Sequence, residues 1–138
     1  EEMSRKETTA GEWEVINKWY ANVEIPSLLS KLLNENLCSW QDNAYWNDNK
    51  NMVNFELESF LANDLFDAKG SNCFSAHSET QTLLKISCDI TIYPEKLPGV
   101  PRIIAKRVRP LVETLIEKMI GPNLTSLGKG LNDYFANL

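Results

Sequence analysis

Histidine and cysteine, the residue types that most often supply nucleophiles, bases and zinc ligands, are scarce in this sequence. His77 is the only histidine, and the cysteines are Cys38, Cys73 and Cys88, with no Cys-x-x-Cys pair. A closed zinc site needs four nitrogen or sulfur ligands, and a nucleophile needs a base within reach. Because His77 falls in an expected turn, we predict neither a metal site nor a nucleophilic centre. Unpaired thiols indicate a cytoplasmic or another reducing compartment.

Carboxylates and glycines give no stronger indication of catalysis. Glu56, Glu58 and Asp89 fall at outward positions of their expected strands, and no pair is forced together for general acid–base work. The Gly128-Lys129-Gly130 segment lacks the preceding strand that a phosphate-binding loop requires. We therefore expect no catalytic residues and no cofactor, which favours a function other than catalysis without deciding the question.

The charge balance narrows the partners. The chain carries 14 Lys+Arg and 19 Asp+Glu, a net charge of −5. Such a balance disfavours phosphate backbones, so no nucleic-acid binding is expected. One basic group opens the expected C-terminal helix, either as a contact for a lipid phosphate or acidic partner or as a solvated face: Arg102, Lys106, Arg107 and Arg109.

Length and composition predict one domain over residues 1–138. The 138 residues include 43% hydrophobic and 24% charged ones, close to the globular average. No apolar run is long enough to cross a bilayer, so no transmembrane segment is expected. The chain opens at Glu1 inside a polar stretch, which suggests a piece of a longer polypeptide.

Alternation of apolar and polar residues predicts the strands that would position any site. Residues 1–11 form a polar N-terminal segment, and residues 12–93 contain about five strands with one short helix at 25–34. The clearest alternation, in 82–93, predicts a central strand with its apolar face buried. Gly70 predicts a bulge or bend in its strand. The expected strands cover residues 12–23, 40–46, 53–61, 65–76 and 82–93.

A helical period follows over residues 101–136. Pro110 and Gly121-Pro122 lie inside it and predict a kink or a break of the helix at these places, because proline lacks the amide donor. Strands followed by one helix make an α+β fold, an antiparallel sheet packed against a long, kinked C-terminal helix. Five strands span roughly 24 Å, whereas one helix is about 10 Å across. Part of the apolar sheet face is therefore expected to lack cover from this helix.

Several segments resemble the end of a START-like (SRPBCC, helix-grip) domain. They are Lys85–Tyr93, the Leu97-Pro98-Gly99-Val100-Pro101 link, and a helix carrying Glu113 and Ile120–Leu124. The resemblance covers most of residues 12–136, but the usual N-terminal strand and two short helices are not evident. It implies a cavity between sheet and C-terminal helix that holds a lipid or another hydrophobic molecule.

Two functions follow from these observations. One is binding of a lipid or other hydrophobic ligand, and the other is a non-catalytic protein-interaction or assembly module that uses the open sheet face, with a homo-oligomer as one form. The first predicts that apolar side chains of the helix face those of the sheet across an incompletely filled gap. The expected lining residues are Phe55, Leu57, Phe74, Ile86, Ile90, Val108, Leu111, Leu115 and Met119.

Overall fold

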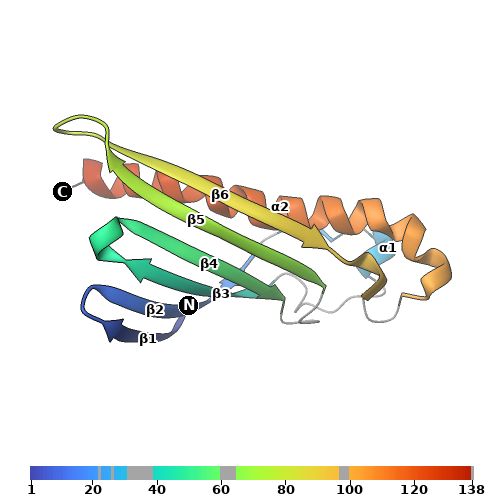
Figure 1. Cartoon of the computed structure of the whole chain (residues 1–138). Coiled ribbons are helices and arrows are strands. Elements are labelled where there is room, and N and C mark those ends of the chain that lie inside the picture. The colour runs from blue at the N-terminus through green and yellow to red at the C-terminus, as the bar shows by residue number, and fades with distance from the viewer. Residues whose placement is uncertain (22, 26, 31–38, 60–64, 97–99, 138) are drawn as a thin grey trace.

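The computed structural model describes residues 1–21, 23–25, 27–30, 39–59, 65–96 and 100–137 (Figure 1). Six strands and one long helix make up most of this part of the chain. The 3₁₀ turns η2 (Asp48–Lys50) and η3 (Pro94–Lys96) and the short helix α1 (Ser27–Ser30) connect them. The main elements are β1 (Glu2–Thr9), β2 (Glu12–Tyr20), β3 (Ser39–Asn47), β4 (Met52–Ser59), β5 (Phe66–Ala76), β6 (Thr82–Ile92) and α2 (Arg102–Ala136).

The α+β class is confirmed, but the sheet has six strands rather than five. Their order is β1-β2-β3-β4-β5-β6, and every neighbouring pair is antiparallel. The additional strand is β1, which lies in the segment 1–11 that was expected only as a polar N-terminal segment. All eight residues of β1 are exposed, so no apolar alternation marks it. Gly11, with a φ of 77°, forms the turn that folds β1 back on β2.

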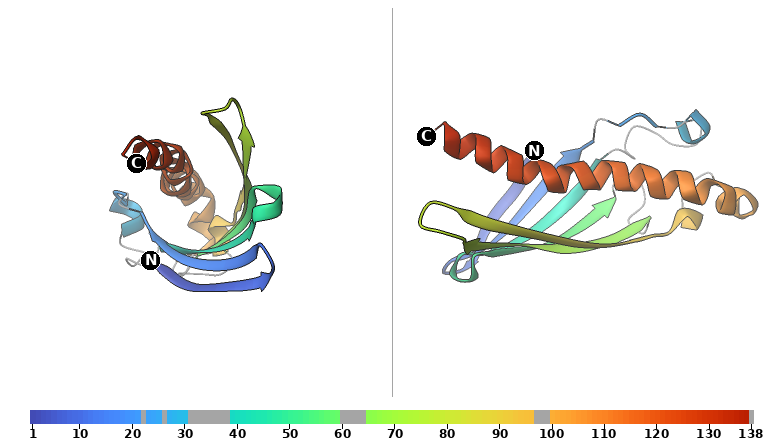
Figure 2. Two further views of the ribbon diagram at one scale, coloured as in Figure 1. Left: turned by 90° about the vertical axis from the view of Figure 1, so that its left-hand side faces the viewer. Right: turned by 90° about the horizontal axis from the view of Figure 1, so that it is seen from above.

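The sheet curves, and α2 lies along its concave side (Figure 2). Strand register determines which side chains share this face, because residues directly opposite in a ladder point the same way. One row across the strands contains Asn17, Asp42, Leu57, Ala68 and Ile90. This row is therefore polar at β2 and β3 and apolar from β4 to β6.

The expected alternation in 82–93 is correct, but the expected position of the strand is not. Side chains of β6 alternate between exposed and half-buried, with Ile86, Cys88 and Ile90 on the half-buried side. However, β6 is an edge strand and not a central one. Nor does Gly70 mark a bulge, because the ladders on both sides of β5 run through it without a register shift.

The C-terminal helix does not break at Pro110 or at Gly121-Pro122, since α2 continues through both prolines to Ala136. Its first turns are inclined to the remainder, which runs past Pro122 (Figure 1). Pro110 and Pro122 are exposed, as are Lys106 and Lys118, whose carbonyls lose their amide partners. Water can satisfy carbonyls on that side, so the opposite face stays packed without a break.

The short helix expected at 25–34 is observed as α1, Ser27–Ser30. Residue 26 and residues 31–34 of that prediction lie outside the described residues.

The main core lies between α2 and the β4–β6 half of the sheet. Strand residues such as Leu57 and Phe66 pack there against one side of the helix, together with Leu65. Among the α2 residues whose burial is described, the buried ones all lie between Ala105 and Ile120: Ala105, Val108, Val112, Leu115, Ile116, Met119 and Ile120. A smaller cluster around Val15, Ala44 and Val53 lies at the other end of the concave face.

Candidate functional site

The structure divides the nine expected ligand-lining residues among different environments. Val108, Leu115 and Met119 are buried in the main core, where Leu111 and Ile90 are partly buried. Phe74 packs against the smaller cluster, and Ile86 is half-buried on β6. Only Phe55 and Leu57 line a groove between α2 and the sheet. This groove lies farther along the helix than the expected position.

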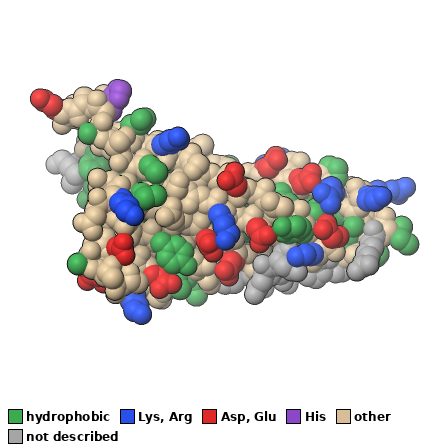
Figure 3. Space-filling model, viewed as in Figure 1, with side chains coloured by type: hydrophobic (Ala, Val, Ile, Leu, Met, Phe, Trp, Pro, Cys, Tyr) green, Lys and Arg blue, Asp and Glu red, His purple; other side chains and the backbone are tan. Residues whose placement is uncertain are grey.

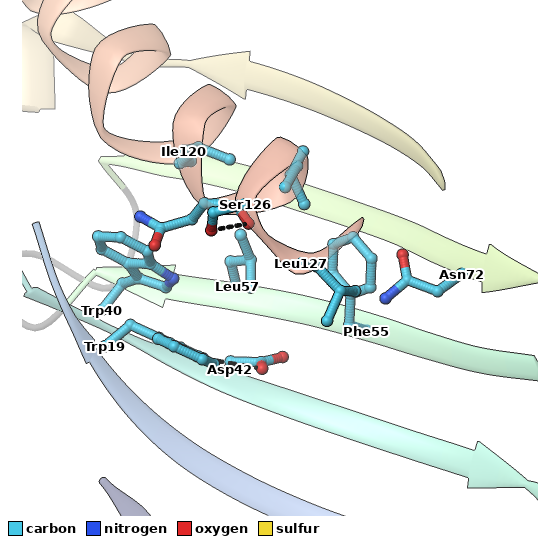
Figure 4. Close-up of a pocket in the computed structure, with 11 residues that line it drawn as sticks. Trp19, Trp40, Asp42, Phe55, Leu57, Asn72, Ile120, Ser126 and Leu127 are labelled. Atoms are coloured by element: carbon cyan, nitrogen blue, oxygen red, sulfur yellow. Dashed lines mark hydrogen bonds between the residues drawn. The ribbon is translucent and has the colours of Figure 1, made fainter. Parts of the chain in front are cut away.

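The groove begins where the packing of α2 ends. Its sheet wall includes Trp40, Phe55 and Leu57, and its helix wall includes Leu124 and Leu127 (Figure 4). Its cavity volume is about 150 Å³, comparable to cavities that take up one benzene-sized molecule. Polar side chains lie at its margins, and the complete lining is Trp19, Trp40, Asp42, Phe55, Leu57, Asn72, Ile120, Asn123, Leu124, Ser126 and Leu127.

Gly70 positions the aromatic wall. It lies directly opposite Phe55 in the β4–β5 ladder. A Cβ atom at Gly70 would overlap the Phe55 ring and the Ser87 carbonyl oxygen. Glycine is therefore required for the ring to lie flat over β5, as in other close approaches to a strand backbone.

Asp42 is the ionisable group of the groove. Its Oδ2 accepts hydrogen bonds from Trp19 Nε1 at 3.0 Å and from Asn17 Nδ2 at 3.5 Å. Its Oδ1 is buried without a hydrogen-bond partner. Burial raises the pKa of Asp42, and the two donors oppose this shift. An acceptor with spare capacity thus lies beside an apolar wall.

Sequence reasoning missed Asp42, although the strand pattern contained the signal. Alternation placed Trp40, Ala44 and Trp46 on one face of their strand. Asp42 shares that parity, so it was a polar residue at an inward position. The helix wall was missed because Leu124 and Leu127 follow the Gly121-Pro122 pair, where the helix was expected to break.

The described part of the chain contains no cluster of side chains suited to metal binding. Its residues include no group of three or more His, Cys, Asp or Glu side chains that could hold a metal ion. His77 lies in the β5–β6 turn, where its backbone N–H donates a hydrogen bond to the carbonyl oxygen of Gln81. Cys73 and Cys88 are free thiols, and burial raises the pKa of Cys88. Cys38 lies outside the described residues.

The basic group at the start of α2 is partly paired. Arg109 Nη2 lies 3.4 Å from Glu95 Oε2, and Arg109 Nη1 lies 3.6 Å from Glu113 Oε1. Lys106 and Arg107 are exposed. On the face seen in Figure 3, acidic and basic side chains alternate over the surface without a continuous basic stripe. The observed charges give this face no track for a phosphate backbone.

A second hollow of about 250 Å³ lies at the β1–β3 end of the sheet. It is lined by Arg5, Trp13, Val15, Trp46 and Asp48, without a side chain from α2. Lacking a helix wall, it is a surface depression. The groove under α2 is the better candidate, because two elements enclose it and a buried acceptor without a partner adjoins its apolar wall.

In the described part of the chain, no helix combines the length and apolar composition that crossing a membrane requires. No protein-family model, curated protein or solved structure matches the sequence.

Proposed function

We propose that this domain binds a small apolar or amphipathic molecule in the groove between the concave sheet face and the C-terminal half of α2. The observation that best supports this proposal is the change in packing along α2. Ile116 and Ile120 are each 1% exposed, whereas Leu127, seven residues beyond Ile120, is 37% exposed. Facing apolar walls that do not meet leave space that a ligand can fill.

The volume of the groove limits the ligand. Sites for drug-sized molecules usually measure about 300–1,000 Å³, and this groove measures about 150 Å³. A single ring or a short hydrocarbon chain suits it better than a two-chain lipid. The START-like resemblance of the sequence supports the same location, between a sheet and a C-terminal helix.

A second candidate is an interaction module. The end of α2 exposes apolar side chains besides Leu127, with Tyr134 62% and Phe135 65% exposed. Tyr134 and Phe135 contact each other edge to face, with ring centroids 5.4 Å apart. A second protein chain that covered them would also close the groove, and this reading predicts self-association or a protein partner.

The test uses 1-octanol as a probe and two tryptophan substitutions. NMR signals of the indole N–H groups of Trp19 and Trp40 report binding, because both residues line the groove. Leu127→Trp should fill the groove, weakening octanol binding at least tenfold while changing the free energy of unfolding by less than about 1 kcal/mol. Leu115→Trp should overpack the core, costing about 1–3 kcal/mol, without blocking the groove of the folded fraction.

The outcomes separate the two candidates. Octanol binding that Leu127→Trp abolishes supports the ligand site. Absence of octanol binding, together with a dimer in light scattering that Leu127→Asp dissociates, would contradict it and favour the interaction module.

A further inference from the structure

Two polar side chains that line the groove each carry a buried acceptor without a donor, whereas the lining residues Asn123 and Ser126 donate hydrogen bonds to backbone carbonyls. Asp42 Oδ1 and Asn72 Oδ1 are the buried side-chain atoms of the described residues that have no hydrogen-bond partner. Both residues line the groove. A buried acceptor without a donor is costly for a protein, so two of them at one site call for an explanation.

The two acceptors lie on either side of the aromatic wall. Asp42 shares a row of the sheet with Leu57 and Ala68, and Asn72 lies on β5 four residues beyond Ala68. Two strand spacings and four residues along a strand correspond to roughly 15 Å. Phe55 lies between them (Figure 4). The groove thus has an apolar middle and an acceptor near each end.

The two ends differ in charge. Asp42 is a carboxyl group, and the described residues that donate to it, Trp19 and Asn17, are neutral. No lysine or arginine forms an ion pair with it in the described ranges. An ammonium group at Asp42 would supply both the missing donor and the missing positive charge. A ligand carboxylate there would face a like charge and gain no hydrogen bond.

We propose that the groove selects amphipathic amines, with the ammonium group bound by Asp42 and the apolar body lying along Leu57 and Phe55 towards Asn72. This inference rests on the proposed ligand-binding function and specifies the chemical class of the ligand. Rotation about χ2 of Asp42 presents either carboxylate oxygen to the groove, and this torsion is soft in aspartate. The Trp19 indole keeps the carboxyl group on the groove side of β3.

The experiment compares three probes with the same chain, octylamine, 1-octanol and octanoate, at neutral pH. The indole signal of Trp19 serves as the readout, since this group donates directly to Asp42. Octylamine should bind about tenfold or more tightly than octanoate, because hydrogen bonds to charged groups are the strong ones. The affinity for octanol should lie between the affinities for octylamine and octanoate.

Asp42→Asn keeps the size of the side chain and removes its charge. It should weaken octylamine binding about tenfold and leave octanol within about threefold. Asp89→Asn is the matched control, because Asp89 is exposed on β6, and it should change none of the three affinities. The probe series in the unmodified protein tests the selection even where a variant fails to fold.

Each outcome decides a separate point. Equal affinities for the three probes, or tighter binding of octanoate, would overturn the selection of amines while leaving the groove as a ligand site. Failure of all three probes to bind would overturn the proposed function and this inference together. Tight octylamine binding that Asp42→Asn leaves unchanged would overturn the assigned role of Asp42.

Discussion

The two halves of α2 cover the same sheet face but pack against it differently. From Ala105 to Ile120 the helix contributes seven buried residues to the core. From Gly121 to Ala136 no residue is buried, and only four are half-buried: Asn123, Leu124, Gly128 and Leu131. The first half of α2 therefore packs into the core and stabilises the fold. The second half, which contains the helix wall of the groove, is called the roof below.

The two halves also differ in their intrinsic preference for a helix. The first half contains Pro110 but no glycine. The second contains Gly121, Pro122, Gly128 and Gly130, and a Cβ at any of these three glycines would meet nothing within 4 Å. Each half contains one proline, so the difference comes from the three glycines, each of which costs about 1 kcal/mol relative to alanine inside a helix. The difference indicates that weak packing and weak propensity coincide over the groove, as at sites that must open.

The largest expected effect comes from placing a charge in each half. Ile116→Asp would bury an unpaired carboxylate at a residue that is 1% exposed, at a cost of several kcal/mol against a total stability of about 5–15 kcal/mol. We expect it to abolish folding. Leu127→Asp, in the second half, should cost less than about 1 kcal/mol. Equal losses in urea denaturation would contradict the division of α2 into two halves.

Glycine substitutions should act in opposite directions in the two parts of the groove. Gly70→Ala in the sheet wall should destabilise the protein by about 1–3 kcal/mol, because the new methyl group would displace both the Phe55 ring and the Ser87 carbonyl oxygen. Gly128→Ala in the roof should stabilise it by about 0.5–1 kcal/mol through helix propensity. Thermal denaturation of both variants measures the pair. A neutral Gly70→Ala would show that the ring is not held against β5.

Amide hydrogen exchange should distinguish the halves without any mutation. Amides of residues 124–135 should exchange at least tenfold faster than those of residues 108–119, because few buried contacts resist opening of the second half. Binding of octylamine should slow exchange in 124–135 and leave 108–119 unchanged. Uniform protection along α2 would mean that the roof opens only when the whole domain unfolds.

The sheet was largely predictable from the sequence, except for the strand β1 and the position of β6. Four strands alternate because one face contacts the core and the other contacts water, and a fifth, 65–76, gives a weaker signal. β1 escaped prediction because it is an edge strand with all its side chains exposed, so no buried apolar positions mark it in the sequence. The position of β6 at the other edge was also inaccessible, since alternation gives the phase of a strand but not its number of neighbours.

The candidate site was less predictable than the sheet. The sequence indicated which faces are apolar, but not how far along α2 the packing would extend. That limit depends on sheet curvature and on the continuity of the helix past Pro122, which only tertiary structure reveals. Phe55 and Leu57 were identified because they lie on the apolar face of their strand, and the structure places both of them in the core and in the groove lining. The polar lining residues contributed nothing to the apolar pattern.

The smallest expected effect is a pH dependence of stability that belongs to Asp42. Burial raises the pKa of Asp42 above the ordinary aspartate value, while the Trp19 indole and Asn17 amide lower it. Below the ordinary pKa of about 3.9, the side chain is neutral in both folded and unfolded protein. Its contribution to stability is fully present there, and it is lost as the pH rises through the folded-state pKa.

Asparagine at position 42 cannot lose a proton, so Asp42→Asn removes this dependence. The free energy of unfolding of the unmodified protein, minus that of Asp42→Asn, should therefore fall as the pH rises from about 4 and then level off. Trp19→Phe removes a donor that lowers the pKa of Asp42. In this variant, the contribution of Asp42 to the free energy of unfolding should therefore decrease more with rising pH than it does in the unmodified protein. Urea denaturation across this pH range gives both differences. A difference that grew with pH would mean that the folded protein favours the charged carboxylate. The groove would then already contain a donor for Asp42, and the case for an amine ligand would lose its basis.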